Sequence, residues 1–316
     1  MSVISLRNLT RDFKTARAVD GLSLDIQAGE LFGLVGPDGA GKTTTLRLLA
    51  GLLDITEGEA RVLDYDLKSQ AEAVKKHIGY MAQRFSLYSE LSVGENLAFF
   101  AEIYDVPREV RPERTAHLLE FAGLTEFRER RAGQLSGGMQ KKLALACTLI
   151  HQPEILLLDE PTTGVDPIAR REFWNILTDL HLGGATIVVS TPYMDEADRC
   201  SRVGLMYAGK LAACAPPREI RRGLGAEVIE LHPTDWQAAR NLVASLEGVR
   251  EVQTYGEALH ILVEAGAGAK RLKEVERALK KHKLAYRSIR LAPPSMEEVF
   301  ISTIRELRER EESHVP

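Results

Sequence analysis

Apolar and polar positions in the first two thirds of the chain follow two recurring patterns. Short apolar runs, as in "GELFGLV" at 29–35, "EILLLDEP" at 154–161 and "TIVVS" at 186–190, are typical of strands buried in a parallel sheet. Other stretches repeat leucine at helical spacing, as in "TTLRLLAGLL" at 44–53. Buried strands separated by helices predict an α/β fold for this part of the chain.

The pattern changes from about residue 225. Strand-like and helix-like segments then follow in the order β-α-β-β-α-β, namely 226–232, 234–248, 249–255, 258–265, 269–282 and 285–291. This order is that of a small ferredoxin-like α+β layer. We expect Thr234 as a possible cap of the first helix. We also expect an apolar helix face made of Trp236, Ala239, Leu242, Val243 and Leu246.

One more helix is predicted after the prolines at 293 and 294. Ser295 and Glu298 have the spacing of a capping box. An apolar stripe follows, made of Met296, Val299, Phe300, Ile304 and Leu307. We expect the stripe to dock on its own domain, and the alternative is contact with a second subunit or a regulatory ligand.

Length and composition indicate a globular protein of two domains. The 316 residues are 44% hydrophobic and 27% charged, which are ordinary globular values. We predict domains at 1–220 and 221–316. Every apolar run is far shorter than the roughly 20 residues that span a bilayer, so we expect a soluble chain.

Charge and cysteine content narrow the possible partners and the compartment. A formal net charge of −4 argues against nucleic-acid binding, and the basic run at 270–283 carries glutamates at helical spacing, typical of a solvated helix face. Cys147, Cys200 and Cys214 lack CxxC spacing, and the scattered histidines predict no structural zinc. The N-terminal stretch has no apolar signal core. We therefore expect a reducing, cytoplasmic location.

The stretch "GPDGAGKTT" at 36–44 carries the first candidate chemistry. It fits the pattern G-x-x-x-x-G-K-[ST] and lies between a predicted strand and a predicted helix. Gly36, Gly39 and Gly41 would let backbone N–H groups turn toward a phosphate chain. Lys42 would reach the terminal phosphates, and Thr43 would bind Mg²⁺.

Two acidic residues at the end of a predicted strand supply a second half-site. Asp159 and Glu160 directly follow the apolar run of 155–158. Asp159 is placed to hold Mg²⁺ through water, and Glu160 to polarise an attacking water molecule. A strand that ends in a solvated acidic turn is the plain alternative, but two matching half-sites argue against it.

A second anion-binding device lies between these two motifs. In "LSGGMQ" at 135–140, Ser136, Gly137 and Gly138 precede an apolar helical run. A serine and bare backbone N–H groups at a helix N-terminus favour an anion. One nucleotide does not need two such sites, so we expect the second to serve a nucleotide held by another copy.

The three motifs together resemble the nucleotide-binding subunit of ATP-binding cassette (ABC) transporters. The resemblance covers about 1–220, and the wording "ELSVGENLAFFAEIY" and "PSMEEVF" is similar to the ABC-2 type of drug and polysaccharide exporters. It implies a P-loop NTPase cassette with a RecA-like core, an antiparallel β part and a helical subdomain at about 84–134. It further implies a cytoplasmic ATPase on the inner face of the cell membrane, paired with an integral membrane permease.

The resemblance also assigns roles to residues by position. Phe13 would stack on adenine, Asp166 would contact a second cassette across a dimer, and Ser136 to Gly138 would close over the partner's nucleotide. Catalysis would involve Glu160, Lys42 and Gln83, with Mg²⁺ held by Thr43, Gln83 and Asp159. The ATP-binding loop would comprise Gly36, Pro37, Asp38, Gly39, Ala40, Gly41, Lys42, Thr43 and Thr44. The pair would be a homodimer or a heterodimer.

The sequence departs from the family at Pro192, where a histidine is expected after an apolar strand. Proline offers neither a side-chain donor nor a backbone N–H for the γ-phosphate. Three interpretations are open: hydrolysis continues with Thr191 or a water substituting, hydrolysis is slow or needs the permease, or the chain is the degenerate half of an unequal pair. Asp38, where the family commonly has asparagine, is expected to point away from the nucleotide.

We therefore predict an ATP-hydrolysing subunit that powers export of a drug-like or other substrate. The alternatives are a hydrolysis-impaired cassette that pairs with another cassette, and a soluble ABC ATPase acting on ribosomes or DNA. The chain has one P-loop and no sustained heptads, which argues against the latter class.

Overall fold

The computed structural model describes residues 1–84 and 86–312. The chain forms two compact units, Met1–Pro217 and Arg218–Pro316. Within the described residues, no helix combines the length and the apolar character needed to cross a bilayer. Each unit is described by itself.

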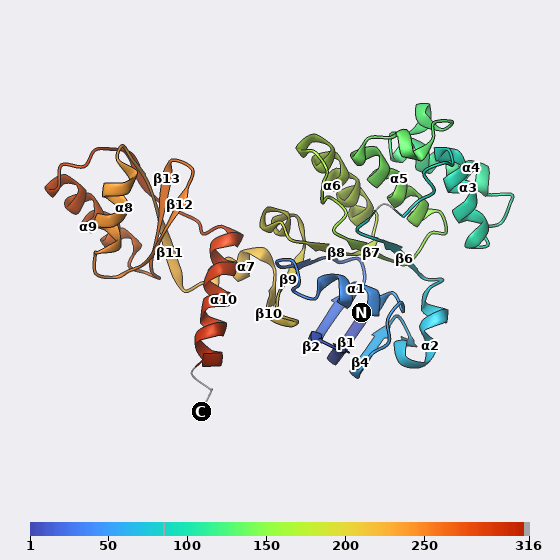
Figure 1. The fold of residues 1–316 in the computed structure, drawn as a ribbon, viewed down its shortest axis with the longest axis horizontal. Coiled ribbons are helices and arrows are strands. Elements are labelled where there is room, and N and C mark those ends of the chain that lie inside the picture. The colour runs from blue at the N-terminus through green and yellow to red at the C-terminus, as the bar shows by residue number, and fades with distance from the viewer. Residues whose placement is uncertain (85, 313–316) are drawn as a thin grey trace. The chain divides into compact units, whose positions relative to one another are not determined.

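A six-stranded sheet forms the centre of the first unit (Figure 1). Its strands, in spatial order, are β10 (Lys210–Ala215), β9 (Arg202–Tyr207), β3 (Leu31–Val35), β8 (Thr186–Thr191), β7 (Ile155–Asp159) and β6 (Ile78–Met81). All neighbours pair in parallel except β10, which is antiparallel to β9. Every residue of β3, β7 and β8 is buried, which confirms the prediction of buried strands from the continuous apolar runs.

A second, antiparallel sheet belongs to the same unit. Its order is β2 (Ala16–Gln27), β1 (Ser2–Phe13), β4 (Glu57–Val62) and β5 (Tyr65–Asp66). Helix α1 (Lys42–Leu49) lies between the two sheets, and its leucines share one core with both. The short helix α2 (Leu67–Val74) packs against β4 and β5.

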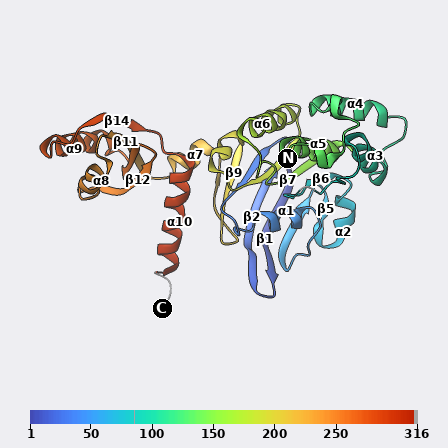
Figure 2. The same cartoon turned by 45° about the horizontal axis from the view of Figure 1, so that its top comes forward.

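The helical part of this unit has a core of its own. Helices α3 (Val93–Ile103), α4 (Arg111–Phe121) and α5 (Gly137–Leu149) contribute to it, together with the 3₁₀ turns η1 (Thr125–Phe127) and η2 (Ala132–Gln134). Figure 2 shows α3 and α4 gathered beside α5 and β6. Helix α6 (Pro167–Leu182) packs on α5, and η3 (Met194–Arg199) follows β8. Phe85, at the start of the predicted helical subdomain, lies outside the described residues.

The second unit has the predicted β-α-β-β-α-β order. It comprises, after α7 (Pro217–Arg222), the elements β11 (Ala226–Pro233), α8 (Trp236–Ala244), β12 (Val249–Tyr255), β13 (Ala258–Glu264), α9 (Gly268–Lys281) and β14 (Tyr286–Ala292). The strand order β12-β13-β11-β14 is antiparallel throughout. Helices α8 and α9 share an apolar core with the sheet, as in a ferredoxin-like layer.

Two local expectations in this unit are wrong. The N-cap of α8 is Asp235, whose side chain accepts the Ala238 N–H at 3.0 Å, not Thr234. Trp236, in the first turn of α8, is 53% exposed and is not part of the core, while Ala239 and Val243 of the predicted face are fully buried.

The final helix α10 (Met296–Glu312) begins with the predicted capping box. Ser295 N–H donates to Glu298 Oε2 at 2.6 Å, and Glu298 N–H donates to Ser295 Oγ at 3.2 Å. The other Glu298 oxygen contacts His260 Nδ1 of β13 at 2.6 Å. Met296, Val299 and Ile304 of the predicted stripe are buried, and Arg305 of the same helix pairs with Glu251 of β12 at 2.8 Å. Burial raises the pKa of Glu298, but the hydrogen bonds from His260 and Ser295 outweigh it and leave the pKa below its ordinary value.

Candidate functional site

The loop between β3 and α1 lines a cavity of about 670 Å³. Gly39 and Gly41 have positive φ angles of 77° and 102°. A Cβ on Gly41 would lie 2.3 Å from Ala18 O, and one on Gly36 would lie 2.2 Å from Met206 O. The backbone therefore approaches its neighbours too closely for any other residue. The residues that line the cavity are Ala18, Asp38, Gly39, Ala40, Gly41, Lys42, Thr43, Thr44, Gln83, Glu160, Thr163, Pro192 and Tyr193.

Lys42 is buried beneath this loop and is linked to Glu160. Its ammonium donates to Gly36 O at 2.8 Å and to Pro37 O at 3.0 Å. Lys42 Nζ also lies 3.3 Å from Glu160 Oε1, and the two side chains are only 3% and 6% exposed. The loop lysine and the strand-end glutamate thus neutralise each other in this structure.

Asp159 ends β7 and is fully buried. Its Oδ1 accepts hydrogen bonds from Thr43 Oγ1 at 2.9 Å and from Ser190 Oγ at 2.8 Å. Tyr80 Oη lies 3.4 Å from Oδ2, and burial, then the nearby Asp159 carboxylate, raise the pKa of Tyr80. A carboxylate and a hydroxyl held side by side are oxygen donors of the kind that a hard divalent cation prefers.

Glu160 is held in a strained backbone conformation at the next position. Its φ of 45° lies in the left-handed region, which non-glycine residues seldom adopt. Its Oε2 accepts from Gln83 Nε2 at 2.8 Å and from Thr163 Oγ1 at 3.2 Å. Its N–H donates to Ser190 Oγ at 3.0 Å. Gln83 lies in the segment after β6 and Ser190 in β8, so contacts from three parts of the chain hold Glu160 in place.

Ser190 and Thr163 belong to the site but lie in none of the predicted motif positions. Ser190 pairs with Asp159 in the parallel register of β7 and β8, and its hydroxyl bridges Asp159 and the Glu160 N–H. Thr163 follows Glu160 by three residues in the turn after β7. The hydroxyl of each was visible in the sequence at a strand end or in a turn, but only the pairing of strands gives Ser190 its partner.

Pro192 follows β8 and lines the cavity together with Tyr193. Thr191 is fully buried, and its hydroxyl donates to Glu196 Oε2 at 2.5 Å and accepts from the Tyr193 N–H at 3.0 Å. Arg170 Nε pairs with Glu196 at 2.6 Å and places its guanidinium 4.3 Å from the Tyr193 ring centre. The Thr191 hydroxyl proton is therefore already used in the hydrogen bond to Glu196.

Ser136 is the N-cap of α5, and Gly137 and Gly138 form its first turn. Among the described residues, these three do not line the cavity. Ser136 Oγ accepts from the Met139 N–H at 3.3 Å. A Cβ on Gly138 would lie 2.5 Å from Ala169 Cβ, so glycine permits the close packing of α5 on α6. Asp166 caps α6, with its Oδ1 3.0 Å from the N–H groups of Ile168 and Ala169.

Lys141 connects α5 to the segment after β6. It is 9% exposed, and its Nζ donates to Gln83 O at 2.6 Å. Burial lowers the pKa of Lys141, and the carboxylates of Asp159 and Glu160 oppose that shift. Phe13, by contrast, lies at the exposed end of β1. It is 43% exposed, and the Arg11 guanidinium lies 4.8 Å from its ring centre.

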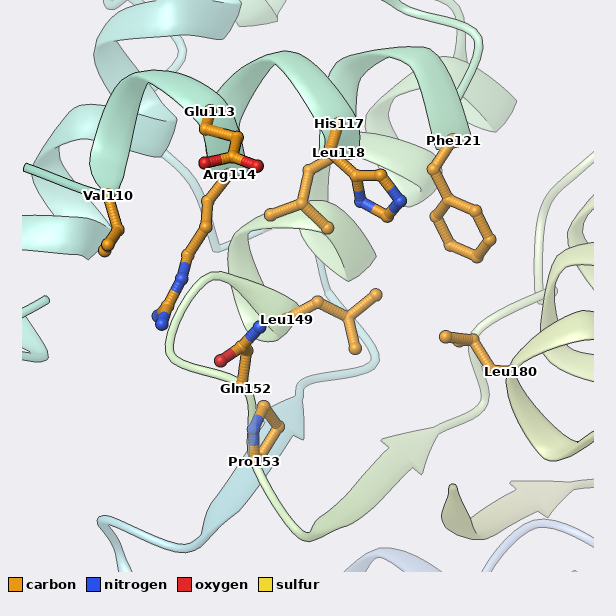
Figure 3. Close-up of a pocket in the computed structure, with 10 residues that line it drawn as sticks. All are labelled: Val110, Glu113, Arg114, His117, Leu118, Phe121, Leu149, Gln152, Pro153 and Leu180. Carbon is orange, nitrogen blue, oxygen red and sulfur yellow. The ribbon is translucent and has the colours of Figure 1, made fainter. Parts of the chain in front are cut away.

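A separate cavity of about 510 Å³ lies between α4 and the end of α5 (Figure 3). Figure 3 shows Leu118 and Phe121 of α4 and Leu149 of α5 among its apolar lining. Arg114, at its edge, donates to Ile150 O at 3.4 Å. The lining is mostly apolar and shares no residue with the cavity at the loop between β3 and α1.

Comparison with protein families matches both units. A family model described as "ABC transporter" matches residues 19–163. A second, described as "ATP-binding protein DrrA1-3-like, C-terminal domain", matches residues 216–304.

Several curated proteins are similar to this chain. The probable multidrug ABC transporter ATP-binding protein YbhF of Escherichia coli (strain K12) is 44% identical over 220 residues, which are 70% of this chain and 38% of YbhF. The daunorubicin/doxorubicin resistance ATP-binding protein DrrA of Streptomyces peucetius is 34% identical over 95% of this chain and 91% of DrrA. The Nod factor export ATP-binding protein I of Burkholderia orbicola (strain AU 1054) is 37% identical over 82% of this chain and 86% of its own length.

Among solved structures, a dimeric post-hydrolysis state of the ATP-binding cassette MJ0796 bound to ADP and Pi matches with a TM-score of 0.62. That match is 28% identical and covers 67% of this chain and 98% of the other. The predicted cassette fold is confirmed by this match.

Proposed function

The chain belongs to the ATP-binding proteins of ABC transporters, and from that premise we propose that it binds and hydrolyses ATP to power export through a separate membrane permease. The observation that carries the proposal is the convergence on one cavity of the phosphate loop, Lys42, Gln83 and Glu160. These are the groups that phosphoryl transfer to water needs.

We propose that ATP lies along the loop with its phosphates on the α1 N-terminus. Lys42 would exchange its pairing with Glu160 for the terminal phosphates, which frees the carboxylate. Thr43, Asp159 and Gln83 would hold Mg²⁺, which supplies neutralisation of phosphate charge. Glu160 would accept a hydrogen bond from the attacking water and take up its proton, with its orientation fixed by Gln83 and Thr163.

Other residues would bind the nucleobase and form the contact with a second cassette. The exposed ring of Phe13 would stack on adenine, backed by Arg11. Ser136 to Gly138 would bind the nucleotide of a second cassette, and Asp166 would lie at the same interface. The second cassette would be another copy of this chain or a different one.

We propose that hydrolysis continues although Pro192 stands where the family has histidine. The contacts that fix Glu160 do not involve residue 192, so the base keeps its orientation. Because the Thr191 hydroxyl already donates to Glu196, a water molecule is the better substitute for the missing histidine. The rival proposal is a hydrolysis-impaired cassette, which Pro192 alone favours.

The transport proposal rests on the relatives. Their names refer to multidrug transport, Nod factor export and resistance to daunorubicin and doxorubicin. We propose that this chain serves export of an amphipathic, drug-like molecule from the inner face of the cell membrane. Residues 1–220 would supply the ATPase, and 221–316 would be an accessory domain.

Two measurements test this proposal. Steady-state hydrolysis of Mg-ATP by the wild type is compared with that of Glu160→Gln, and equal rates would refute the catalytic part. The tagged chain is then purified from gently solubilised native membranes. A multi-span protein in near-equal amount is expected, whereas ribosomal proteins or DNA instead would refute the transport part.

A further inference from the structure

Lys141 occupies a position that the proposed catalytic roles leave unexplained. It lies five residues after Ser136, which is about 7.5 Å along the axis of α5 at 1.5 Å per residue. A lysine is seldom this deeply buried unless its ammonium has a fixed partner. The partner here is the backbone carbonyl of Gln83, at 2.6 Å.

The side chain of the same residue, Gln83, contacts the catalytic carboxylate. Gln83 Nε2 donates to Glu160 Oε2 at 2.8 Å. The route from the start of α5 to Glu160 therefore consists of one helix, one ammonium and one glutamine. Because Lys141 holds the main chain of Gln83, a displacement of α5 would move that main chain and with it the side-chain amide that binds Glu160.

We propose that Lys141 is a positioning residue that couples the Ser136–Gly138 end of α5 to the Gln83–Glu160 hydrogen bond. The proposal rests on the proposed function, in which that end of α5 binds the nucleotide of a second cassette. Binding there would shift α5, and Lys141 would carry the shift to Gln83 and hence to the base of its own site. One nucleotide site would thereby set the activity of the other.

The neighbouring Lys142 provides a matched control. It has the same charge and lies on the same helix, but its Nζ pairs with Glu172 of α6 at 2.6 Å. Substitution of either lysine by methionine removes one charge and leaves an unbranched side chain that is one atom shorter. Only Lys141→Met removes a contact with Gln83.

The experiment measures the ATP dependence of hydrolysis for the wild type, Lys141→Met, Lys141→Arg and Lys142→Met. We expect Lys141→Met to lower maximal turnover about tenfold, the size expected for losing a hydrogen bond to a charged group. We expect its Hill coefficient to fall toward one. Nucleotide affinity, measured at equilibrium in a Glu160→Gln background, should stay within about threefold. Lys141→Arg should restore turnover and cooperativity, and Lys142→Met should resemble the wild type.

A double-mutant cycle with Gln83→Ala shows whether Lys141 acts through the glutamine. If it does, adding Lys141→Met to Gln83→Ala causes little further loss. If the loss of turnover in the double variant equals the product of the losses in the two single variants, the inference is overturned. If thermal unfolding shows that Lys141→Met is poorly folded, the cycle is run with Lys141→Gln, which keeps a donor without the charge.

The remaining outcomes separate this inference from the proposed function. A wild type that does not hydrolyse Mg-ATP overturns both. A wild type that hydrolyses ATP without cooperativity, or a Lys141→Met variant that behaves like Lys142→Met, overturns only the inference.

Discussion

The buried pair of Lys42 and Glu160 gives a quantitative prediction for the nucleotide-free protein. Removing one partner of a buried pair leaves the other charge without compensation, at a cost of about 3 to 5 kcal/mol. The two carbonyls that accept from Lys42 remain in Glu160→Gln, and the glutamine stays polar. We therefore expect Glu160→Gln to lower the free energy of unfolding of the first unit by about 2 kcal/mol, and Lys42→Met by about 3 kcal/mol.

The double variant decides whether these costs come from the pair. If they do, Lys42→Met/Glu160→Gln costs at least about 1.5 kcal/mol less than the sum of the single variants, because neither charge is left alone. The reference is Lys142→Met, whose exposed partner predicts a loss of less than about 1 kcal/mol.

The chain offers a probe confined to the first unit. The chain has two tryptophans. Trp174 lies in α6 of the first unit and is 1% exposed, whereas Trp236 belongs to the second unit. In a Trp236→Phe background, urea titration followed by tryptophan fluorescence reports the first unit alone. Additive losses in the double variant would refute the reasoning, since they would mean that the two side chains do not neutralise each other.

Three further predictions concern the packing of α5 on α6, the acid stability of the second unit and the stacking of adenine. Gly138→Ala should lower the free energy of unfolding by about 1 to 3 kcal/mol, seen as a lower unfolding temperature, because its Cβ would meet α6 at 2.5 Å. Gly137→Ala is the control, since its Cβ has no neighbour closer than 3.8 Å. The lowered pKa of Glu298 stabilises the second unit above the ordinary glutamate pKa of about 4.3, and this contribution is lost as the pH falls through the folded pKa. Acid titration of Glu298→Gln should show a smaller loss of second-unit stability, and an unchanged acid profile would contradict this. Phe13→Ala should raise the KM for ATP about tenfold with little change in kcat, as loss of base stacking predicts, and an unchanged KM would exclude stacking on this ring.

Much of the fold followed from local patterns. The continuous apolar runs became β3, β7 and β8 because a strand buried on both faces has no polar side to show. The order of the second unit also followed from its periodicity. The errors there, the cap at Asp235 and the exposure of Trp236, concern the first turn of one helix, where the pattern fixes neither the starting residue nor the packing of the side chain.

The sequence by itself determined the phosphate loop, the acidic strand end and the glycines of α5, because each requirement is local. A tight loop demands glycine, and a motif fixes the order of its neighbours along the chain. Only the tertiary structure decided which groups meet. Ser190 reaches Asp159 through the register of two parallel strands, Glu160 pairs with Lys42, and Lys141 reaches the Gln83 carbonyl. These contacts join residues far apart in the sequence, and no periodicity along the chain records the strand order and helix packing that bring them within hydrogen-bond distance.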